Sequence, residues 1–541
     1  MSLQSSVRRD ASQILTELVK SPKRATKYKK AYLTSLQVDT TQLTPLRTLS
    51  MFVEADLTRK QYEIIRTSNK KLYSCYSVLQ KEKRKCYPQK ESYRVTETCA
   101  EIELQHLLDH TVTRLLTYLQ DILTDLTQEE RNTLELISKW GCDGSQQSQF
   151  KQKMQNNDAT DSNIFQSCLV PLQLVCGKNK KKIIWQNPTP SSPRYCRPIR
   201  IRFVKETTDI TNSEINYVQN QINLLKNNLF MNEGVSASVR HSMAFTMVDG
   251  KVCNAATQTT STMRCYICGA TSKQFNDLTI KKVVDVEALA FGLSILHARI
   301  RFFESILHLS YKLPVKKWQL RSEADKTIVF REETGLIDMP KAGFGNTNDG
   351  NTSRRFFSNP HKASEITGVD FNLIYKLKII LEVISSGHKV DLKKFADYCL
   401  ETAKYYIALY PWHPITPTMH KILVHGATVM EIALLPIGML SEEAAEARNK
   451  HFRLYRNSFA RKFSREECNV DVLNRLLLSS DPLITSLRPK PPKSSKPFSK
   501  EAIEMLIAPD VDENVDNSDS EEQVEEKADE SEDEPWHSSS S

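Results

Sequence analysis

The order of the predicted elements indicates an α+β protein. Helical periodicity dominates up to about residue 138, β-branched runs suited to strands follow between about 139 and 260, and helical periodicity then returns. Strands confined to one block of an otherwise helical chain are typical of an α+β fold. Apolar residues make up 40% of the 541 and charged residues 26%, which suits a packed core and excludes a chain that is disordered throughout.

Helices are predicted first along the chain. Residues 1–50 form a basic, turn-rich segment. Helices are expected over 58–69 and over 101–123, where leucines recur at steps of three and four residues. The sequence Thr127-Gln-Glu-Glu matches a capping box, so it should open a further helix that ends near Lys139.

Strands are predicted where apolar and β-branched residues run together. Three such runs cover 168–176, 183–186 and 199–204, and a fourth covers about 243–252. Between the third and the fourth strand, residues 210–229 return to helical periodicity. This block therefore contains both strands and at least one helix.

The rest of the chain is predicted to be helical and then unstructured. A helix is expected over 286–311, a glycine- and asparagine-rich loop over 343–351, and helices over nearly all of 363–463. Residues 489–497 have the Pro- and Lys-rich composition of a linker. We expect the acidic residues after 510 to be disordered, because they cannot bury enough apolar area to offset the entropy of the chain.

No segment for export or for crossing a membrane is predicted. The sequence has no run of about 18 apolar residues, so we expect no membrane-spanning helix and no membrane partner. The first 20 residues lack the apolar core of a secretory signal. The 12 cysteines are then expected to be reduced thiols, and a close pair of them is a metal-site candidate.

The net charge of +9 conceals two parts of opposite charge. Residues 510–541 hold 14 acidic residues and the single basic residue Lys527, which leaves 73 Lys and Arg against 51 Asp and Glu, a net charge of +22, for residues 1–509. A body this basic favours a polyanionic partner, with nucleic acid as the first candidate. A solvated surface that is rich in lysine is the alternative.

Two pairs of residues could form a zinc site. Cys265 and Cys268 have the C-x-x-C spacing with which two thiolates bind one tetrahedral ion from a tight turn. His420 and His425 are the best candidates for the second pair, although a histidine pair also occurs by coincidence in a helical core. A complete site with four protein ligands would have a structural role, linking segments that are more than 150 residues apart.

Two aspartates could bind a hard cation such as Mg²⁺. Asp143 lies in Trp-Gly-Cys-Asp-Gly-Ser, just after the helix expected to end near Lys139, and Asp249 lies at the end of an apolar run. Mg²⁺ is usually held by one or two carboxylates together with substrate phosphates, and a pair of ions supports in-line phosphoryl transfer. The alternative is that each aspartate caps a turn beside its glycine, since Asp-Gly is a common turn dipeptide.

A third carboxylate would complete such a site. Glu442, Glu443 and Glu446 lie within one and a half turns at the start of a predicted helix. Capping and interaction with the helix dipole account equally for Glu442 and Glu443. Glu446 lies deeper in the helix between two alanines, but spacing alone does not rank the three acids.

Taken together and in this order, these segments resemble the catalytic subunit of the V(D)J recombinase and the related Transib-type DDE transposases. The likeness spans about residues 55–470 and is carried by WGCDGS around Asp143, Asp249 followed by Cys265-x-x-Cys268, His420-x4-His425 and SEEAAEARNKHFR. In this alignment the metal-binding glutamate falls on Glu446. Glu206, in FVKETTD, resembles an additional acid of the active-site region.

The resemblance implies an RNase H-like mixed-sheet catalytic core that is interrupted by a large helical zinc-binding insertion. The segments expected are a basic N-terminal segment (1–50), a helical pre-catalytic or dimerisation region (51–138), the RNase H-like core (139–260), the zinc-binding insertion (261–435), a region with the catalytic helix (436–475), and a linker with the disordered acidic tail (476–541).

The activity implied by the resemblance is DNA nicking and strand transfer. Asp143, Asp249 and Glu446 would hold two Mg²⁺ or Mn²⁺ ions, and the freed 3′-OH would attack the opposite strand or a target DNA. Cys265, Cys268, His420 and His425 would hold a structural Zn²⁺. The expected partners are double-stranded DNA, as element ends and target, a second copy of the chain, and an accessory recombinase subunit. The expected location is the nucleus.

Two basic groups are candidates for DNA contact. Lys23, Arg24 and Lys27 lie in the N-terminal segment, and Arg354 and Arg355 follow the glycine- and asparagine-rich loop. For the second group, a turn with an exposed basic edge is an equal alternative.

Two other functions stay open at this point. One is a domesticated, catalytically silent DNA-binding protein derived from such a transposase. The other is a zinc-binding interaction module, which leaves the three acids without a role.

Overall fold

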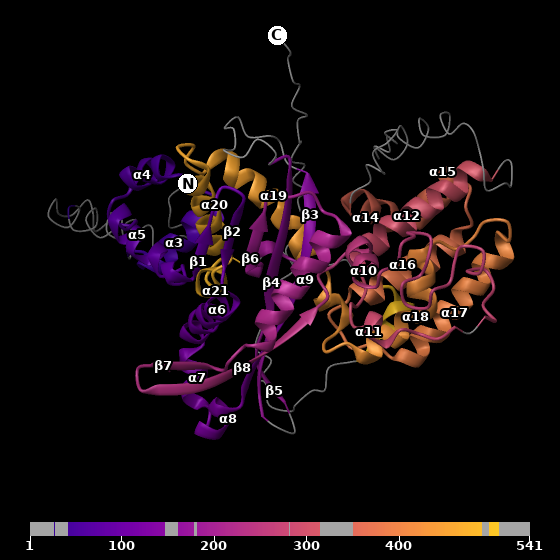
Figure 1. Ribbon diagram of the computed structural model, residues 1–541, viewed down its shortest axis with the longest axis horizontal. Helices are drawn as coiled ribbons and strands as arrows, with labels where there is room; N and C mark the ends of the chain where they lie inside the picture. Colours follow the sequence, from indigo (N-terminus) through magenta and orange to yellow (C-terminus); the bar gives the residue numbers. More distant parts are fainter. Residues whose placement is uncertain are drawn as a thin grey trace, which may run out of the picture. The chain divides into compact units, whose positions relative to one another are not determined.

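A mixed β-sheet of eight strands lies at the centre of the computed structural model (Figure 1). The structure describes Thr26 and residues 42–146, 161–177, 181–280, 282–313, 350–489 and 497–507. The strands are β1 (Tyr93–Val95), β2 (Cys99–Ile102), β3 (Leu134–Gln146), β4 (Asn163–Cys176), β5 (Lys182–Gln186), β6 (Arg197–Arg202), β7 (Asn228–Asn232) and β8 (Val235–Phe245). Together with the helices around them, these strands confirm the predicted α+β fold.

The strand order is β1-β2-β6-β4-β3-β8-β7, with β5 also paired to β4. Every pairing is antiparallel except that of β3 with β8, which run parallel from Leu134 opposite Val239 to Trp140 opposite Phe245. The first nine residues of β3 are buried, because the sheet is covered on both faces. A strand buried on both faces usually has an almost continuous apolar sequence; β4 comes close to this, whereas β3 also buries Glu135, Ser138 and Lys139.

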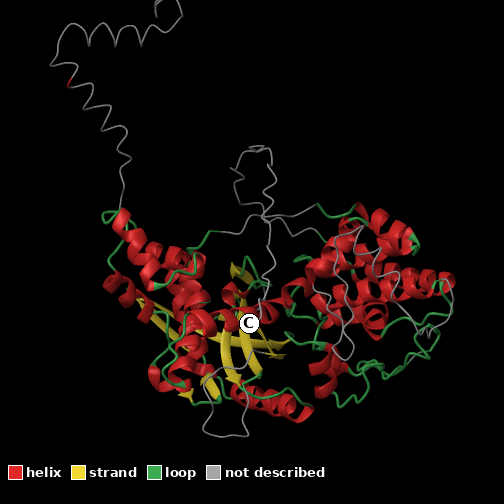
Figure 2. Ribbon diagram, turned by 90° about the horizontal axis from the view of Figure 1, so that it is seen from above, coloured by secondary structure: helices red, strands yellow, loops and turns green. Residues whose placement is uncertain are grey.

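Helices cover the sheet and follow it along the chain (Figure 2). Those that precede the helical region after residue 260 are α3 (Pro45–Glu54), α4 (Arg59–Ser68), α5 (Tyr76–Arg84), α6 (Leu104–Tyr118), α7 (Gln120–Asp125), α8 (Gln128–Asn132), α9 (Thr208–Asn223) and α10 (Gly250–Ala256). Those after it are α11 (Val286–Leu289), α12 (Ile295–Lys312), α14 (Gly350–Ser358), α15 (Pro360–Thr367), α16 (Phe371–Ser385), α17 (Leu392–Leu409), α18 (Pro417–Ile432), α19 (Glu443–Ser458), α20 (Arg465–Ser479), α21 (Pro482–Ser486) and α22 (Lys500–Met505). Short 3₁₀ turns lie at Lys90–Ser92, Pro193–Tyr195 and Ile437–Leu440.

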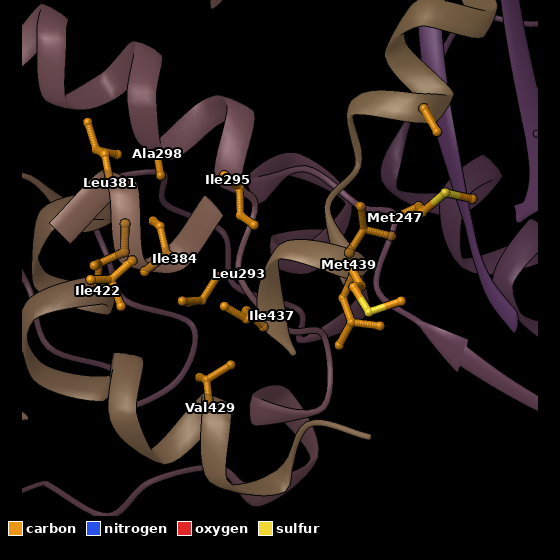
Figure 3. Close-up of a cluster of buried hydrophobic side chains, with 14 of the residues drawn as sticks. Met247, Leu293, Ile295, Ala298, Leu381, Ile384, Ile422, Val429, Ile437 and Met439 are labelled. Atoms are coloured by element: carbon orange, nitrogen blue, oxygen red, sulfur yellow. The ribbon is translucent and has the colours of Figure 1, made fainter. Parts of the chain in front are cut away.

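One hydrophobic cluster joins the sheet to the helical region. Figure 3 shows Met247, which follows β8, and Met439 beside Ile295 of α12 and Ile437. Ile422 of α18 belongs to the same cluster, together with side chains of α16. The helical region is therefore continuous with the core of the sheet, and the segments that lead to Asp249 and Glu446 are packed against it.

Two further clusters attach the C-terminal helices. Trp140 of β3, Phe452 of α19 and Leu476 of α20 are buried in the second cluster. In the third, Leu478 and Ile484 pack against α3, α4 and α5. Residues 476–487, which we expected to belong to a linker, therefore end α20 and form α21 against the core. The six-segment division itself stays a prediction.

The structure corrects several predicted element boundaries. The capping box at Thr127 is present, but its helix ends at Asn132 and β3 begins at Leu134, so the predicted helix to Lys139 is wrong. Asp143 therefore lies within a strand and does not follow a helix. Pairing with β4 and β8 buries this stretch on both sides and overrides the local helical signal.

Three other predictions also differ from the structure. The predicted helix over 286–311 is two helices, because Gly292 adopts a left-handed φ of 72° between them. The predicted strand over 243–252 begins earlier, at Val235, and ends at Phe245. The short strands β1, β2 and β7 were not predicted, since three to five residues give too little periodicity.

Some predicted segments lie outside the described residues. These are most of the basic segment up to residue 41, most of the 343–351 loop, residues 490–496 of the linker and the acidic tail. Within the described part of the chain, no single helix is long and apolar enough to span a membrane; one pair, α18 with Ile437–Ser458, passes that test jointly with a 90° bend.

A buried ion pair is predicted to contribute strongly to stability. Arg114 of α6 donates to both carboxylate oxygens of Asp481 at 2.8 and 3.1 Å, and both side chains are buried. Arg114→Leu should lower the free energy of unfolding by about 3–5 kcal/mol, because it leaves a buried carboxylate unpaired. Urea unfolding measures this loss.

The matched control is Arg59→Leu, which removes an exposed pair with Glu63 and should cost no more than about 1 kcal/mol. Equal losses in the two variants would contradict the assignment of the buried pair.

Candidate functional site

Asp143 and Asp249 lie at the same edge of the sheet. Because β3 and β8 run parallel, their carboxyl ends meet there, and the Trp140 carbonyl accepts hydrogen bonds from the amides of Thr246 and Met247 at 3.2 and 3.1 Å. Asp143 follows three residues after Trp140, and Asp249 follows two after Met247. The sheet therefore brings together two aspartates that are 106 positions apart in the sequence.

The glycines on either side of Asp143 permit close approach to it. A Cβ at Gly141 would lie 1.8 Å from the Met247 carbonyl oxygen, and one at Gly144 would lie 2.7 Å from Oε2 of Glu206. Neither position could carry a side chain without moving its neighbour. Gly141 thus allows the segment before Asp249 to lie against β3, and Gly144 allows the carboxylate of Glu206 to do so.

Asp249 is also the N-cap of α10. Its Oδ1 accepts hydrogen bonds from the amides of Lys251 and Val252 at 2.9 and 2.8 Å. The turn-capping alternative therefore applies to this residue. Both hydrogen bonds use Oδ1, so the cap does not compete with ligand binding by Oδ2.

Glu446 is linked to Asp143 through its own helix. Asn449, one turn further along α19, donates to Oδ2 of Asp143 at 2.6 Å and accepts from Nε2 of Gln166 at 2.5 Å. Asn449 and Gln166 are both buried. Asn449 was not recognised as a positioning residue from sequence, although it lies in the segment that carries the family resemblance.

Four carboxylates share one electrostatic environment at this edge. The pKa of Asp143 is raised well above its usual value, first by burial and then by the charges of Asp249, Glu446 and Glu206. Burial also raises the pKa of Glu206, while a hydrogen bond from Lys251 Nζ at 2.6 Å opposes that shift. Clustered carboxylates that destabilise one another's charge are a fitting environment for a bound cation.

The acids are near one another without forming a closed cage. Among the described residues, one group of three or more His, Cys, Asp and Glu ligand atoms lies entirely within 4.8 Å, and it is the cysteine–histidine cluster, not these acids. Glu446 itself is exposed. An arrangement of this kind suits an ion that keeps waters and substrate oxygens among its ligands.

The alternative third acids have other partners. Glu442 is buried and accepts four hydrogen bonds at the start of α12, from Ser294 Oγ, the amides of Ile295 and His297, and Nδ1 of His297. Glu443 pairs with Arg299 and Arg354. Glu442 therefore caps a neighbouring helix, which is close to the capping role considered for it from sequence.

His297 is a charged group at the site that the sequence analysis did not find. Burial lowers its pKa, but the hydrogen bond and charge of Glu442, with the charges of Asp249 and Asp143, outweigh burial and raise the pKa to about 9. The imidazole is therefore protonated at neutral pH and places a positive charge near the two aspartates. A lone histidine in an amphipathic helix carries no sequence signal of this kind.

A cleft of about 500 Å³ opens beside Glu446. Its walls come from α12, α14 and α19, with Ser191. The basic side chains that line it are His297, Arg301, Arg354 and Lys450. Arg354, predicted as a DNA contact, therefore lies in the same cleft as Glu446, whereas Lys23, Arg24 and Lys27 lie outside the described residues; Arg355 is exposed on α14.

A buried lysine anchors the start of α19 to β3. Lys139 is fully buried, and its Nζ donates to the carbonyl oxygens of Met439 and Ser441 at 2.8 and 2.6 Å. Burial lowers its pKa to about 8. The strand that carries Asp143 thus holds the segment from which the helix of Glu446 begins.

The cysteine–histidine cluster is assembled as predicted. The ligand atoms of Cys265, Cys268, His420 and His425 all lie within 4.8 Å of one another, and Cys268 Sγ is 3.4 Å from His420 Nε2. Two sulfurs and two imidazole nitrogens in this arrangement could hold a structural zinc ion.

The local structure fits a metal in this cluster. The Cys265 carbonyl accepts from the amide of Gly269, which has a left-handed φ of 68°, so the C-x-x-C turn closes tightly. Both histidines project from α18, where Nδ1 of His420 and Nε2 of His425 are buried without hydrogen-bond partners. Buried imidazoles with so few protein hydrogen bonds are those expected of metal ligands.

Comparison with known proteins gives little further information. No family model matches the chain, and no curated protein matches it. The solved structure titled "Drosophila P element transposase strand transfer complex" gives a TM-score of 0.30 at 9% sequence identity, covering 85% of this chain and 100% of that one. At that TM-score the likeness does not support an argument about fold or function.

Zinc removal is predicted to destabilise the protein. Cys268→Ser should abolish the binding of one zinc ion per chain and lower the melting temperature, since the cluster joins the C-x-x-C turn to α18. Elemental analysis of the purified protein and thermal unfolding measure the two effects. Cys99→Ser, a partly buried cysteine outside the cluster, is the control and should retain the metal.

The charge on His297 predicts a pH dependence of stability. Because its folded pKa of about 9 exceeds the ordinary value of 6.5, its contribution is complete below about pH 6.5 and is lost as the pH rises through 9. The difference in unfolding free energy between parent and His297→Gln should therefore shrink from pH 6.5 to 9 in urea titrations.

The control for this experiment is His451→Gln. Burial lowers the pKa of His451 to about 4, so this imidazole stays neutral throughout the range. Its effect on stability should not vary between pH 6.5 and 9. A constant difference for His297→Gln as well would contradict the assigned charge.

Proposed function

We propose that the chain is a DDE-type DNA transposase or recombinase, which nicks DNA and transfers the freed strand. The observation that carries this proposal is the position of Asp143 and Asp249 at one edge of the sheet, with Asp143 hydrogen-bonded to Asn449 one turn after Glu446. Three carboxylates from a strand, a helix cap and a helix are a suitable ligand set for two Mg²⁺ or Mn²⁺ ions.

The metal ions would supply Lewis acidity and a metal-bound nucleophile when present. Oδ2 of Asp249 is available beside the capping atom Oδ1, and Asn449 holds Asp143 in place through Oδ2. Glu446 reaches the group from the exposed side of α19. Glu206, held by Lys251, is an accessory acid at the same edge.

The cations of the cleft would bind the DNA backbone. His297, Arg301, Arg354 and Lys450 line the space next to Glu446 and can contact phosphate oxygens on either side of the scissile bond. In a nick, water attacks the phosphorus and the bond to O3′ breaks, leaving a 3′-OH and a 5′-phosphate. That 3′-OH then displaces a second O3′ in strand transfer.

The proposed core is RNase H-like, with a zinc-binding helical insertion between Asp249 and Glu446. The parallel β3–β8 pair, which leads to both aspartates, and the helical segments after α10 support this interpretation. The zinc ion would have a structural role, because four protein ligands leave no open position.

The proposed partners are those of such an enzyme. Double-stranded DNA would serve as element end and target, and the basic charge of residues 1–509 supports it. A homodimer that holds two DNA ends, an accessory subunit and a nuclear location are further parts of the proposal.

Metal-dependent nicking tests the proposal. With Mg²⁺ or Mn²⁺, the parent should nick DNA that carries the repeats flanking its own gene. Asp143→Asn, Asp249→Asn and Glu446→Gln should each reduce the rate by about 100-fold or more, because each removes a ligand worth several kcal/mol to the transition state. DNA binding, measured by fluorescence anisotropy, should be retained in all three.

Glu443→Gln is the matched control on the same helix. It should retain nicking, and loss in this variant but not in Glu446→Gln would reassign the third acid. If the parent binds DNA but nicks it with neither Mg²⁺ nor Mn²⁺, the alternative is favoured, which is a domesticated and catalytically silent DNA-binding protein.

A further inference from the structure

The helices α4 and α5 form a basic hairpin away from the acids. Residues 59–94 hold eleven Lys and Arg against three Asp and Glu. The two helices pack together at one side of the molecule, where the Arg59 guanidinium lies 5.0 Å from the Tyr76 ring centroid and the Tyr62 hydroxyl donates to the Ser74 carbonyl at 2.5 Å (Figure 1). The charges of both helices are therefore held in one folded element.

Most of these cations are exposed and lack an acidic partner. Six basic side chains of this segment are exposed and form no ion pair within the described part of the chain: Lys60, Lys70, Lys71, Lys81, Arg84 and Lys90. The three acids of the segment do not balance them: Glu63 and Glu82 are already paired, with Arg59 and Lys85.

Two basic side chains beneath the hairpin add little to its positive charge. Lys83 is buried, with its Nζ 3.8 Å from the ring centroid of Phe52. Arg475 packs against the same ring at 5.5 Å. Burial and the charge of Arg475 lower the pKa of Lys83 to about 7, and Arg475 itself pairs with Asp56 at 3.0 Å, so the positive charge of the hairpin comes from its exposed side chains.

We propose that this basic hairpin is a second DNA-binding surface, which contacts the phosphate backbone of a duplex. The choice of DNA as the polyanion rests on the proposed function, but the surface is distinct from the cleft beside Glu446. The hairpin packs with α3 and with Leu478 and Ile484 in the third cluster, whereas Asp143 and Asp249 lie at the carboxyl ends of β3 and β8.

The composition of the surface favours a duplex over other polyanions. Single-stranded nucleic acid is usually bound by exposed aromatic platforms, but the one large hydrophobic side chain exposed between 59 and 94 is Ile64. Amphipathic helices that lie in a membrane surface usually also insert several apolar side chains. Lysines and arginines without such groups suit phosphate contacts that are independent of sequence.

Salt-dependent binding of a mixed-sequence duplex by the full chain tests the inference. The surface variant combines Lys70→Gln, Lys71→Gln, Lys81→Gln and Arg84→Gln. Because each phosphate contact contributes about 0.9 to the slope of log affinity against log salt, this variant should lose up to about 3–4 from the slope. Its affinity at physiological salt should fall at least about tenfold.

The matched control removes four exposed cations elsewhere that also lack ion pairs: Lys273→Gln, Lys389→Gln, Lys393→Gln and Lys404→Gln. It should change the slope by less than about 1. If the slope falls equally in the two variants, the effect is caused by net charge alone and the inference is overturned. An unchanged slope in the surface variant would also overturn it. Anionic vesicle binding that falls in the surface variant while duplex binding does not would assign the surface to a membrane instead.

The nicking assay keeps this inference separate from the proposed function. If the surface variant loses duplex binding while the parent never nicks DNA, the surface stands and the catalytic proposal fails. If the parent nicks DNA and the surface variant binds the duplex with an unchanged slope, the catalytic proposal stands and the surface is wrong. Equal melting temperatures for both variants and the parent exclude unfolding as the cause.

Discussion

The parallel pairing of β3 with β8 is the constraint on which the candidate site depends. Among the described strands it is the one parallel pair, so it brings the carboxyl ends of two directly adjacent strands to the same edge. An antiparallel pairing would send Asp143 and Asp249 to opposite edges. Gly141 permits the close approach of β3 to the segment that follows β8, because any side chain at this position would meet the Met247 carbonyl.

The second constraint is the attachment of α19 to the strand that carries Asp143. Lys139 holds the carbonyls before the helix, and Asn449 bonds Asp143 one turn after Glu446. Arg448, buried beside Asn449, donates to the Pro193 carbonyl at 2.6 Å. A helix held on both sides of Glu446 cannot shift that carboxylate without breaking buried hydrogen bonds, which is the condition for a preorganised metal ligand.

The two candidate metal sites differ in the way that their chemistries require. The cysteine and histidine ligand atoms lie within 4.8 Å of one another and are mostly buried, as suits a closed structural site. The carboxylates are more widely spaced, and Glu446 opens onto a cleft lined by both basic and acidic side chains. That openness is what a site must have if substrate phosphates are to complete the coordination of its ions.

Much of the local structure could be predicted from sequence. The capping box at Thr127, the strand at 168–176 and the tight C-x-x-C turn depend on neighbouring residues, and the structure contains each of them. The four-residue zinc cluster was predicted as well, because its donor types and spacings restrict the choices. The grouping of the acids was expected from order and resemblance, and their roles stay a prediction.

What the sequence by itself determined is therefore the inventory: an α+β chain, a zinc ligand set and the candidate acids. The tertiary structure decided which neighbours each acid contacts. It used Glu442 to cap α12 and placed His297 among the aspartates. It also ended the helix after Thr127 early, so that Leu134–Gln146 could join the sheet. Such outcomes depend on contacts between residues more than 100 positions apart, for which local periodicity and capping carry no signal.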